Sequence, residues 1–108
     1  MKNMASSNEY LQFILEQLSD LEKITYRTMM GEFILYYRGR IVGGIYDNRL
    51  LVKPTKSAVS YMPAATYELP YDGAKEMPLA EDVDNRTFLT GLFRAMYDEL
   101  PAARPKKL

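Results

Sequence analysis

Apolar side chains recur at helical spacing near the start of the chain, and polar residues take most of the surface between them. This stripe consists of Leu11, Ile14, Leu15, Leu18 and Leu21. The preceding SSNE motif, residues 6–9, has the capping-box pattern, in which the Ser6 hydroxyl accepts a hydrogen bond from the backbone N–H of Glu9. The pattern therefore predicts a helix that begins at Ser6.

In residues 24–53 the apolar pattern changes from the helical period to the two-residue period of a β-strand. The segment is rich in Tyr, Ile, Val and Thr, which suit a half-buried pleated surface. Three pairs of turn-forming residues interrupt this run: Met30-Gly31, Arg38-Gly39 and Asp47-Asn48. Each supplies a residue that tolerates positive φ where a hairpin must reverse. We expect three or four antiparallel strands, with a bulge at Gly43-Gly44 or a helix packed closely on it.

The segment after these strands predicts a short helix and two brief strands. Residues 55–62 form the helix, with Thr55 as its N-cap. Residues 67–69 and 75–77 can each form a short strand around a turn. Because Pro78 cannot donate a ladder hydrogen bond, any strand that includes it should lie at an edge.

A last helix is expected over about residues 84–100, where apolar side chains again recur at helical spacing. Asp82 and Asp84 then place negative charge at the positive end of the helix dipole. Gly91 costs the helix about 1 kcal/mol relative to alanine, so we expect a close neighbour there.

These elements predict an α+β fold, in which an N-terminal helix, a short middle helix and a C-terminal helix pack on an antiparallel sheet of about four to six strands. A chain of 108 residues fits a single domain. We assign residues 6–100 to that domain, residues 1–5 to a flexible N-terminus and residues 101–108 to a flexible basic tail.

The composition removes most catalytic chemistry. The chain contains neither Cys nor His, which excludes thiolate nucleophiles, imidazole bases and the usual transition-metal sites. The glycines within residues 39–44 match no nucleotide-binding motif. Glu81, Asp82 and Asp84 lack the spacing and central glycine of a calcium loop, and helix capping accounts for them. We therefore expect no catalytic residue, no cofactor and no metal.

The N-terminal segment has no apolar signal region, and no apolar run approaches the roughly 18 residues of a membrane span. We therefore expect a cytoplasmic protein without membrane association. The formal net charge is zero, but seven cations and two acids between Lys23 and Lys56 give +5, whereas eight acids and three cations between Glu68 and Glu99 give −5. Either the two halves neutralise each other across one domain, or a basic sheet face meets an acidic partner.

The motifs TYRTMMGEF, LYYRGRIVGGIYDNRL and LLVKP follow one another in this order, and the chain closes with GAKEMPLAEDVDNRTFLTGLFRAMYDELP. Together with the capped first helix, they closely resemble the amino-terminal domain of the TfoX/Sxy competence-regulator family, over roughly residues 5–100. The resemblance implies an α+β domain with its helices packed on one antiparallel sheet. It also implies regulation of natural competence at promoters, alongside the cyclic-AMP receptor protein, by longer members that carry a second, helical domain. We expect a stand-alone short form, and the resemblance transfers no catalytic residue to it.

The leading hypothesis is a non-enzymatic regulatory or adaptor domain with a protein partner. Arg27, Arg38 and Arg40 would supply charge to the contact, and Tyr36 and Tyr37 would supply amphipathic area. Strand alternation sends the two tyrosines to opposite faces of the sheet. At most one of them is therefore expected to be available to a partner.

Phe13 is a sixth candidate, because it lies about 200° from Leu11 around the helix axis. Either a chain end or loop covers it, or it contacts a partner or another protomer. A homodimer through Phe13 or through the sheet edge is compatible with every hypothesis. The alternative function is binding of single-stranded nucleic acid on the basic, tyrosine-rich strands, assisted by the cations of residues 101–108, although the net charge does not favour it. A small-ligand carrier or an enzyme is the minor alternative.

Overall fold

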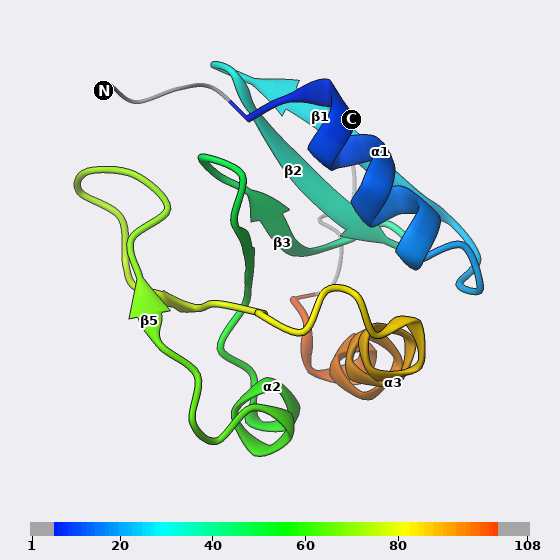
Figure 1. Cartoon of the computed structure of the whole chain (residues 1–108). Helices are drawn as coiled ribbons and strands as arrows, with labels where there is room; N and C mark the ends of the chain where they lie inside the picture. Colours follow the sequence, from blue (N-terminus) through cyan, green and yellow to red (C-terminus); the bar gives the residue numbers. More distant parts are fainter. Residues whose placement is uncertain (1–5, 102–108) are drawn as a thin grey trace, which may run out of the picture.

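The structure is a computed structural model that describes residues 6–101, and it confirms the predicted α+β fold. The expected flexible N-terminus, and the expected basic tail apart from Pro101, lie outside the described residues. A four-stranded antiparallel sheet has the order β1 (Ile24–Met29), β2 (Glu32–Tyr37), β3 (Arg40–Ile45), β4 (Leu50–Val52). A separate two-stranded sheet pairs β5 (Tyr67–Glu68) with β6 (Met77–Pro78). The helices are α1 (Asn8–Gln17), α2 (Lys56–Tyr61), α3 (Arg86–Met96) and the 3₁₀ turn η1 (Tyr97–Glu99) (Figure 1).

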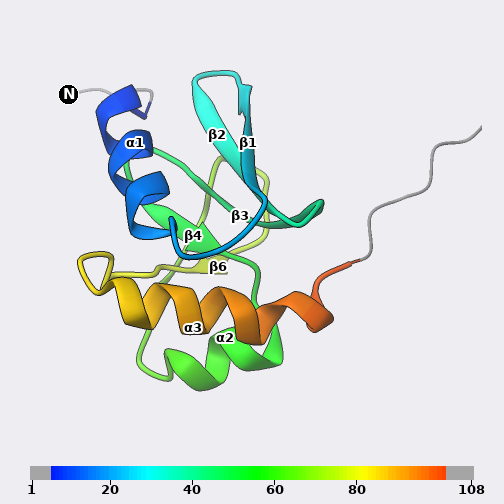
Figure 2. The same cartoon turned by 90° about the vertical axis from the view of Figure 1, so that its right-hand side faces the viewer.

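Both long helices pack on one face of the four-stranded sheet. In β2 the residues Phe33, Leu35 and Tyr37 are buried, whereas Ile34 and Tyr36 on the opposite face are only partly buried. The buried set joins the apolar stripes of α1 and α3 in one core. Figure 1 shows α1 lying across β1 and β2, and Figure 2 shows α2 and α3 running side by side. Within residues 6–101, no helix covers the opposite face of the sheet.

All three predicted hairpin turns are confirmed. The φ angles are 52° and 85° in Met30-Gly31, 52° and 84° in Arg38-Gly39, and 56° at both residues of Asp47-Asn48. Positive φ at both central residues matches the right-handed twist of the strands that such a turn connects. The local turn chemistry therefore sets the lengths of the first three strands.

A β-bulge interrupts the pairing of β2 with β3. Leu35 pairs with Gly43, but the next residue, Tyr36, pairs with Ile41. Val42 is therefore the extra residue of β3. The bulge predicted beside the glycine pair is confirmed.

The alternative prediction, a helix packed on the glycine pair, is wrong, because the close neighbours come from the sheet. A Cβ at Gly43 would collide with the carbonyl oxygen of Leu51 in β4. A Cβ at Gly44 would lie 2.7 Å from the carbonyl oxygen of Phe33 and equally close to the Tyr46 ring. Only glycine fits both positions without displacing backbone.

Thr55 caps α2 as predicted, and its hydroxyl accepts from the Ala58 N–H at 3.1 Å. The starts of α1 and α3 differ by one or two residues from those expected. Ser7, rather than Ser6, caps α1, and its hydroxyl accepts a hydrogen bond from the Tyr10 N–H at 3.1 Å. The capping box was the wrong reading of the SSNE motif.

Asn85 caps α3 by accepting from the Phe88 N–H at 3.0 Å. Asp82 and Asp84 lie just before the N-cap of α3, at the end of the helix where negative charge was expected.

Ser6 instead anchors the start of the domain to two turns. Its backbone N–H donates to the Gly31 carbonyl at 3.1 Å, and its hydroxyl donates to Glu32 Oε1 at 2.9 Å. The same hydroxyl accepts from the Asn48 N–H at 2.9 Å, and Glu32 Oε1 also accepts from the Asp47 N–H at 3.0 Å. The first and third hairpin turns are therefore held to the start of α1.

Substitution by alanine should change the free energy of unfolding in opposite directions at Gly43 of β3 and Gly91 of α3. We expect Gly43→Ala to lower the free energy of unfolding by about 3 kcal/mol, because the methyl meets strand backbone that no side-chain rotation can move. Gly91→Ala is the matched control, since a Cβ there would lie 3.6 Å from the Tyr61 hydroxyl, an ordinary contact. It should raise the free energy of unfolding by up to about 1 kcal/mol. Urea unfolding measures both, and equal effects would contradict the packing described.

Candidate functional site: the open face of the sheet

The uncovered face of β1, β2 and β3 is a candidate binding surface, and we call it the open sheet face. It consists of Thr25, Arg27 and Met29 from β1, Ile34 and Tyr36 from β2, and Ile41 from β3. Met29 is 48% exposed and Ile41 is 39% exposed. Apolar area of this kind around a cation is common at protein interfaces. Among these residues, Thr25, Met29, Ile34 and Ile41 were missed as candidates, although alternation from Arg27 and Tyr36 points to them.

Two of the predicted site residues meet on the open sheet face. Arg27 pairs directly with Ile34, so Tyr36, two residues further along β2, is its diagonal neighbour. Arg27 is exposed, and no acidic side chain within residues 6–101 forms an ion pair with it. Tyr37 faces the core and is only 5% exposed, with its ring 6.4 Å from that of Phe93. Of the two tyrosines, only Tyr36 is placed to meet a partner.

Arg38 and Arg40 lie at a different place, beside the C-terminal end of α3. Their guanidinium carbons lie 4.9 and 4.4 Å from the centre of the Tyr97 ring. Arg40 Nη1 also donates to the carbonyl oxygens of Tyr97 at 3.0 Å and Leu100 at 3.4 Å. A cation that bonds the last carbonyls of a helix stabilises that end. Arg40 is therefore part of the scaffold.

Phe13 belongs to a third surface, on α1. Its side chain is 37% exposed, and its ring lies 6.2 Å from the Tyr10 ring. Because α1 packs on the covered face of the sheet, Phe13 does not contribute to the open sheet face. The six predicted residues therefore divide among three regions and the core.

Within residues 6–101, one ion pair joins the oppositely charged halves of the chain. Arg49, after the third hairpin turn, pairs with Glu68 of β5, and its Nη2 also donates to the Leu69 carbonyl at 3.2 Å. Arg86 pairs instead with Glu16 at 3.4 Å, across α3 and α1. Arg40 and Arg49 thus serve internal contacts, and the seven cations do not form one basic face.

A pocket of about 350 Å³ continues the open sheet face. Ile34 and Ile41 form part of its wall, and the segment that connects β5 to β6, together with Met77 of β6, forms another part. Lys53 and Lys75 line it together with a single acid, Glu76. A ligand or side chain that entered this pocket would therefore meet apolar walls and two cations.

Tyr46 also lines this pocket, and its ring lies 6.2 Å from that of Tyr71. Burial raises the pKa of the Tyr46 hydroxyl, with smaller contributions from Tyr71 and Glu32. The hydroxyl therefore stays protonated at neutral pH, where it can donate a hydrogen bond but cannot act as a base.

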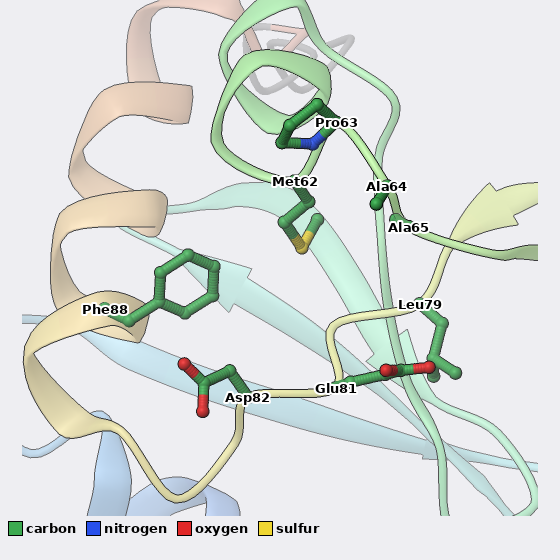
Figure 3. Close-up of a pocket in the computed structure, with 8 residues that line it drawn as sticks. All are labelled: Met62, Pro63, Ala64, Ala65, Leu79, Glu81, Asp82 and Phe88. Atoms are coloured by element: carbon green, nitrogen blue, oxygen red, sulfur yellow. The ribbon is translucent and has the colours of Figure 1, made fainter.

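A second pocket, of about 250 Å³, lies between the end of α2 and the start of α3. Figure 3 shows the Met62 and Phe88 side chains pointing into this space, with the Asp82 carboxylate nearby. Glu81 also lines it. Within residues 6–101, no group of three or more acidic side chains is placed to hold a metal ion. None of the helices in that range is long and apolar enough to cross a bilayer.

Glu99 ties the end of the domain to α2. Its carboxylate accepts from the backbone N–H of Ser57 at 2.9 Å and from the Ser57 hydroxyl at 2.8 Å. These two hydrogen bonds are the main reason why the pKa of Glu99 is lowered, and Thr55 and the charge of Lys56 add to the effect. A carboxylate in this position satisfies a donor in the first turn of α2.

Comparison with known proteins points to the same family as the sequence motifs. The family model for the TfoX N-terminal domain matches residues 16–98. A protein of Spirochaeta aurantia, described as an uncharacterized 12.7 kDa protein in the trpE 5′ region, is 32% identical over 105 residues. The matched region covers 96% of this chain and 91% of that protein. No solved structure gives a significant match.

Arg40 and Arg27 should contribute differently to the free energy of unfolding. We expect Arg40→Ala to lower the free energy of unfolding by about 2 kcal/mol, because it removes charged hydrogen bonds to two carbonyls and the stacking on Tyr97. Arg27→Ala should change it by less than about 0.5 kcal/mol, since Arg27 is exposed. Urea unfolding of both variants checks this. A larger loss for Arg27→Ala would contradict the division into scaffold and surface arginines.

The contribution of the Glu99 carboxylate to the free energy of unfolding should decrease in acid. Because the folded protein holds the pKa of Glu99 below its ordinary 4.5, the ionised carboxylate stabilises the fold at neutral pH. That contribution is lost as the pH falls from 4.5 through the lower folded pKa. Glu99→Gln should therefore unfold at a lower urea concentration than wild type at pH 7, and the difference should shrink as the pH falls. A difference independent of pH would rule out this role for the carboxylate charge.

Proposed function

The chain belongs to the TfoX N-terminal domain family, and on that premise we propose that it is a non-enzymatic regulatory or adaptor domain that binds another protein through the open sheet face. The observation that carries the proposal is the one-sided covering of the sheet by α1 and α3. It leaves Arg27, Met29 and Ile41 exposed on the opposite face. We assign the partner to transcription or competence control, as the family resemblance implies.

The make-up of the open sheet face supports a protein as partner. Partly buried Ile34 and Tyr36 lie at its centre, with exposed Met29, Ile41 and Arg27 around them. Aromatic residues, Met and Arg are enriched at protein interfaces, and an apolar centre with a more polar rim is their usual arrangement. The chain also offers no Cys or His for catalysis.

Single-stranded nucleic acid remains the second candidate, because Tyr36 and Arg27 are diagonal neighbours and two lysines line the adjoining pocket. A base can stack on such a ring while the cations meet phosphates. This mode predicts affinity that falls steeply with salt, since phosphate contacts release counterions. Affinity that stays flat between low and physiological salt would exclude it.

A quantitative pull-down from host lysate, with and without nuclease, tests the proposed function. The test variant, Arg27→Glu with Ile41→Glu, changes the open sheet face and leaves Arg40 intact. The control variant, Arg94→Glu with Val59→Glu, makes the same kind of change at exposed positions on α3 and α2. Circular dichroism and urea unfolding establish that both are folded.

We expect wild type and the control variant to capture the same protein after nuclease treatment, and the test variant to capture at least about tenfold less, which corresponds to about 1.4 kcal/mol. Equal capture by all three proteins would exclude the open sheet face as the binding surface. Enrichment that disappears with nuclease would favour nucleic acid instead.

A further inference from the structure

The two edges of the four-stranded sheet are covered differently. Beside β4, Leu51 forms a bridge with Leu79, and the Ala80 N–H donates to the Leu50 carbonyl at 2.9 Å, so the chain covers this edge itself. At the opposite edge, β1 pairs with β2 and with no other strand among the described residues. Every residue of β1 after Ile24 is exposed. β1 also lacks a proline and a bulge, two devices that commonly prevent the addition of another strand.

The backbone groups that β1 turns toward solvent follow from its first hairpin. Residues that flank a two-residue turn form a hydrogen-bonded pair, and such pairs alternate with non-hydrogen-bonded pairs along the ladder. Met29 and Glu32 flank the turn, so odd-numbered residues of β1 direct their N–H and C=O groups at β2. The hydrogen bond from the Arg38 N–H to the Lys23 carbonyl, 3.0 Å long, has the same parity. The outward-directed groups therefore belong to Ile24, Tyr26 and Thr28.

We propose that this edge pairs with β1 of a second copy of the chain, antiparallel, about a two-fold axis at Tyr26. In this register Tyr26 lies opposite the partner's Tyr26, and Ile24 lies opposite the partner's Thr28. All three outward-directed residues then form hydrogen-bonded pairs, and the four-stranded sheet doubles. A two-fold axis at Thr25 or at Arg27 would leave one of the three opposite a residue outside the strand. The strand is therefore most self-complementary about Tyr26.

The side chains also suit this register. Arg27 lies opposite the partner's Thr25, and Lys23 lies opposite the partner's Met29, so no two cations face each other directly. A register centred on Arg27 would instead place two guanidinium groups opposite each other. Tyr26 is 44% exposed and its ring packs edge-on against Phe33, 5.9 Å away, which leaves area for contact with the partner's Tyr26.

The pairing places the open sheet faces of the two copies side by side. A two-fold axis that joins two strands edge to edge and runs perpendicular to the sheet keeps the open sheet faces of both copies on one side. The interface contains little more than one strand from each copy, so the dimer is at the small end of interface sizes and depends on concentration. The dimer does not depend on the proposed function, and its test needs no other partner.

The molar mass in solution is the first test. By light scattering or sedimentation, wild type should rise from 12.5 kDa toward about twice that mass as its concentration rises. Tyr26→Lys places two like charges opposite each other at the axis and should raise the dissociation constant at least about tenfold. Val59→Lys is the control, at a site on α2 that is also 44% exposed. Wild type that stays monomeric at every concentration, or a dimer unchanged in folded Tyr26→Lys, would overturn the proposal.

A cysteine scan tests the register without depending on the fold of the lysine variant. Since the chain contains no Cys, a single Tyr26→Cys substitution can cross-link only to another copy. Its distance to the partner's equivalent residue, about 5.5 Å between Cα atoms, suits a disulfide. Thr25→Cys and Arg27→Cys are the matched controls, since each is directly opposite itself only in a shifted register. Mild oxidation should cross-link Tyr26→Cys fastest, and faster cross-linking of either control would overturn the register.

Discussion

The packing of α1 and α3 on the same side of the sheet is the constraint on which the rest of the structure depends. Burial of Phe33, Leu35 and Tyr37 beneath these helices removes apolar surface of the sheet from water and joins it to the helices in one core. Because a strand sends alternate side chains to opposite faces, it also leaves Ile34 and Tyr36 on a face that no helix of residues 6–101 covers. The exposed surface proposed for binding is thus the direct counterpart of the core.

The basic residues divide in the same way between scaffold and surface. Arg40 bonds the Tyr97 and Leu100 carbonyls of the turn that follows α3, and Arg49 joins the four-stranded sheet to the small sheet through Glu68. These contacts use charge to hold distant parts of the chain together. Arg27 has no such contact within the described residues, and it is the cation that lies on the open sheet face. A count of charges along the sequence cannot separate these roles.

Sequence patterns predicted the features that depend on neighbouring residues. The three turns follow from residues that accept positive φ, and the separation of Tyr36 from Tyr37 follows from alternation. The roles of Ser6 and Arg40 were missed because their partners lie 25 to 60 residues away, at positions that only the folded chain brings near. The helix expected beside the glycines was wrong for a related reason, since a glycine pair indicates a close neighbour but does not identify it.

The sheet is covered by helices on one face and leaves β1 as an open edge. Amide hydrogen exchange, followed by NMR in dilute protein, is the sharpest test of this arrangement, because an amide hydrogen-bonded within the sheet exchanges slowly. We expect alternation along β1, with slow exchange at Arg27 and fast exchange at Tyr26 and Thr28. Uniform protection of all three amides in dilute monomer would show instead that another segment covers this edge.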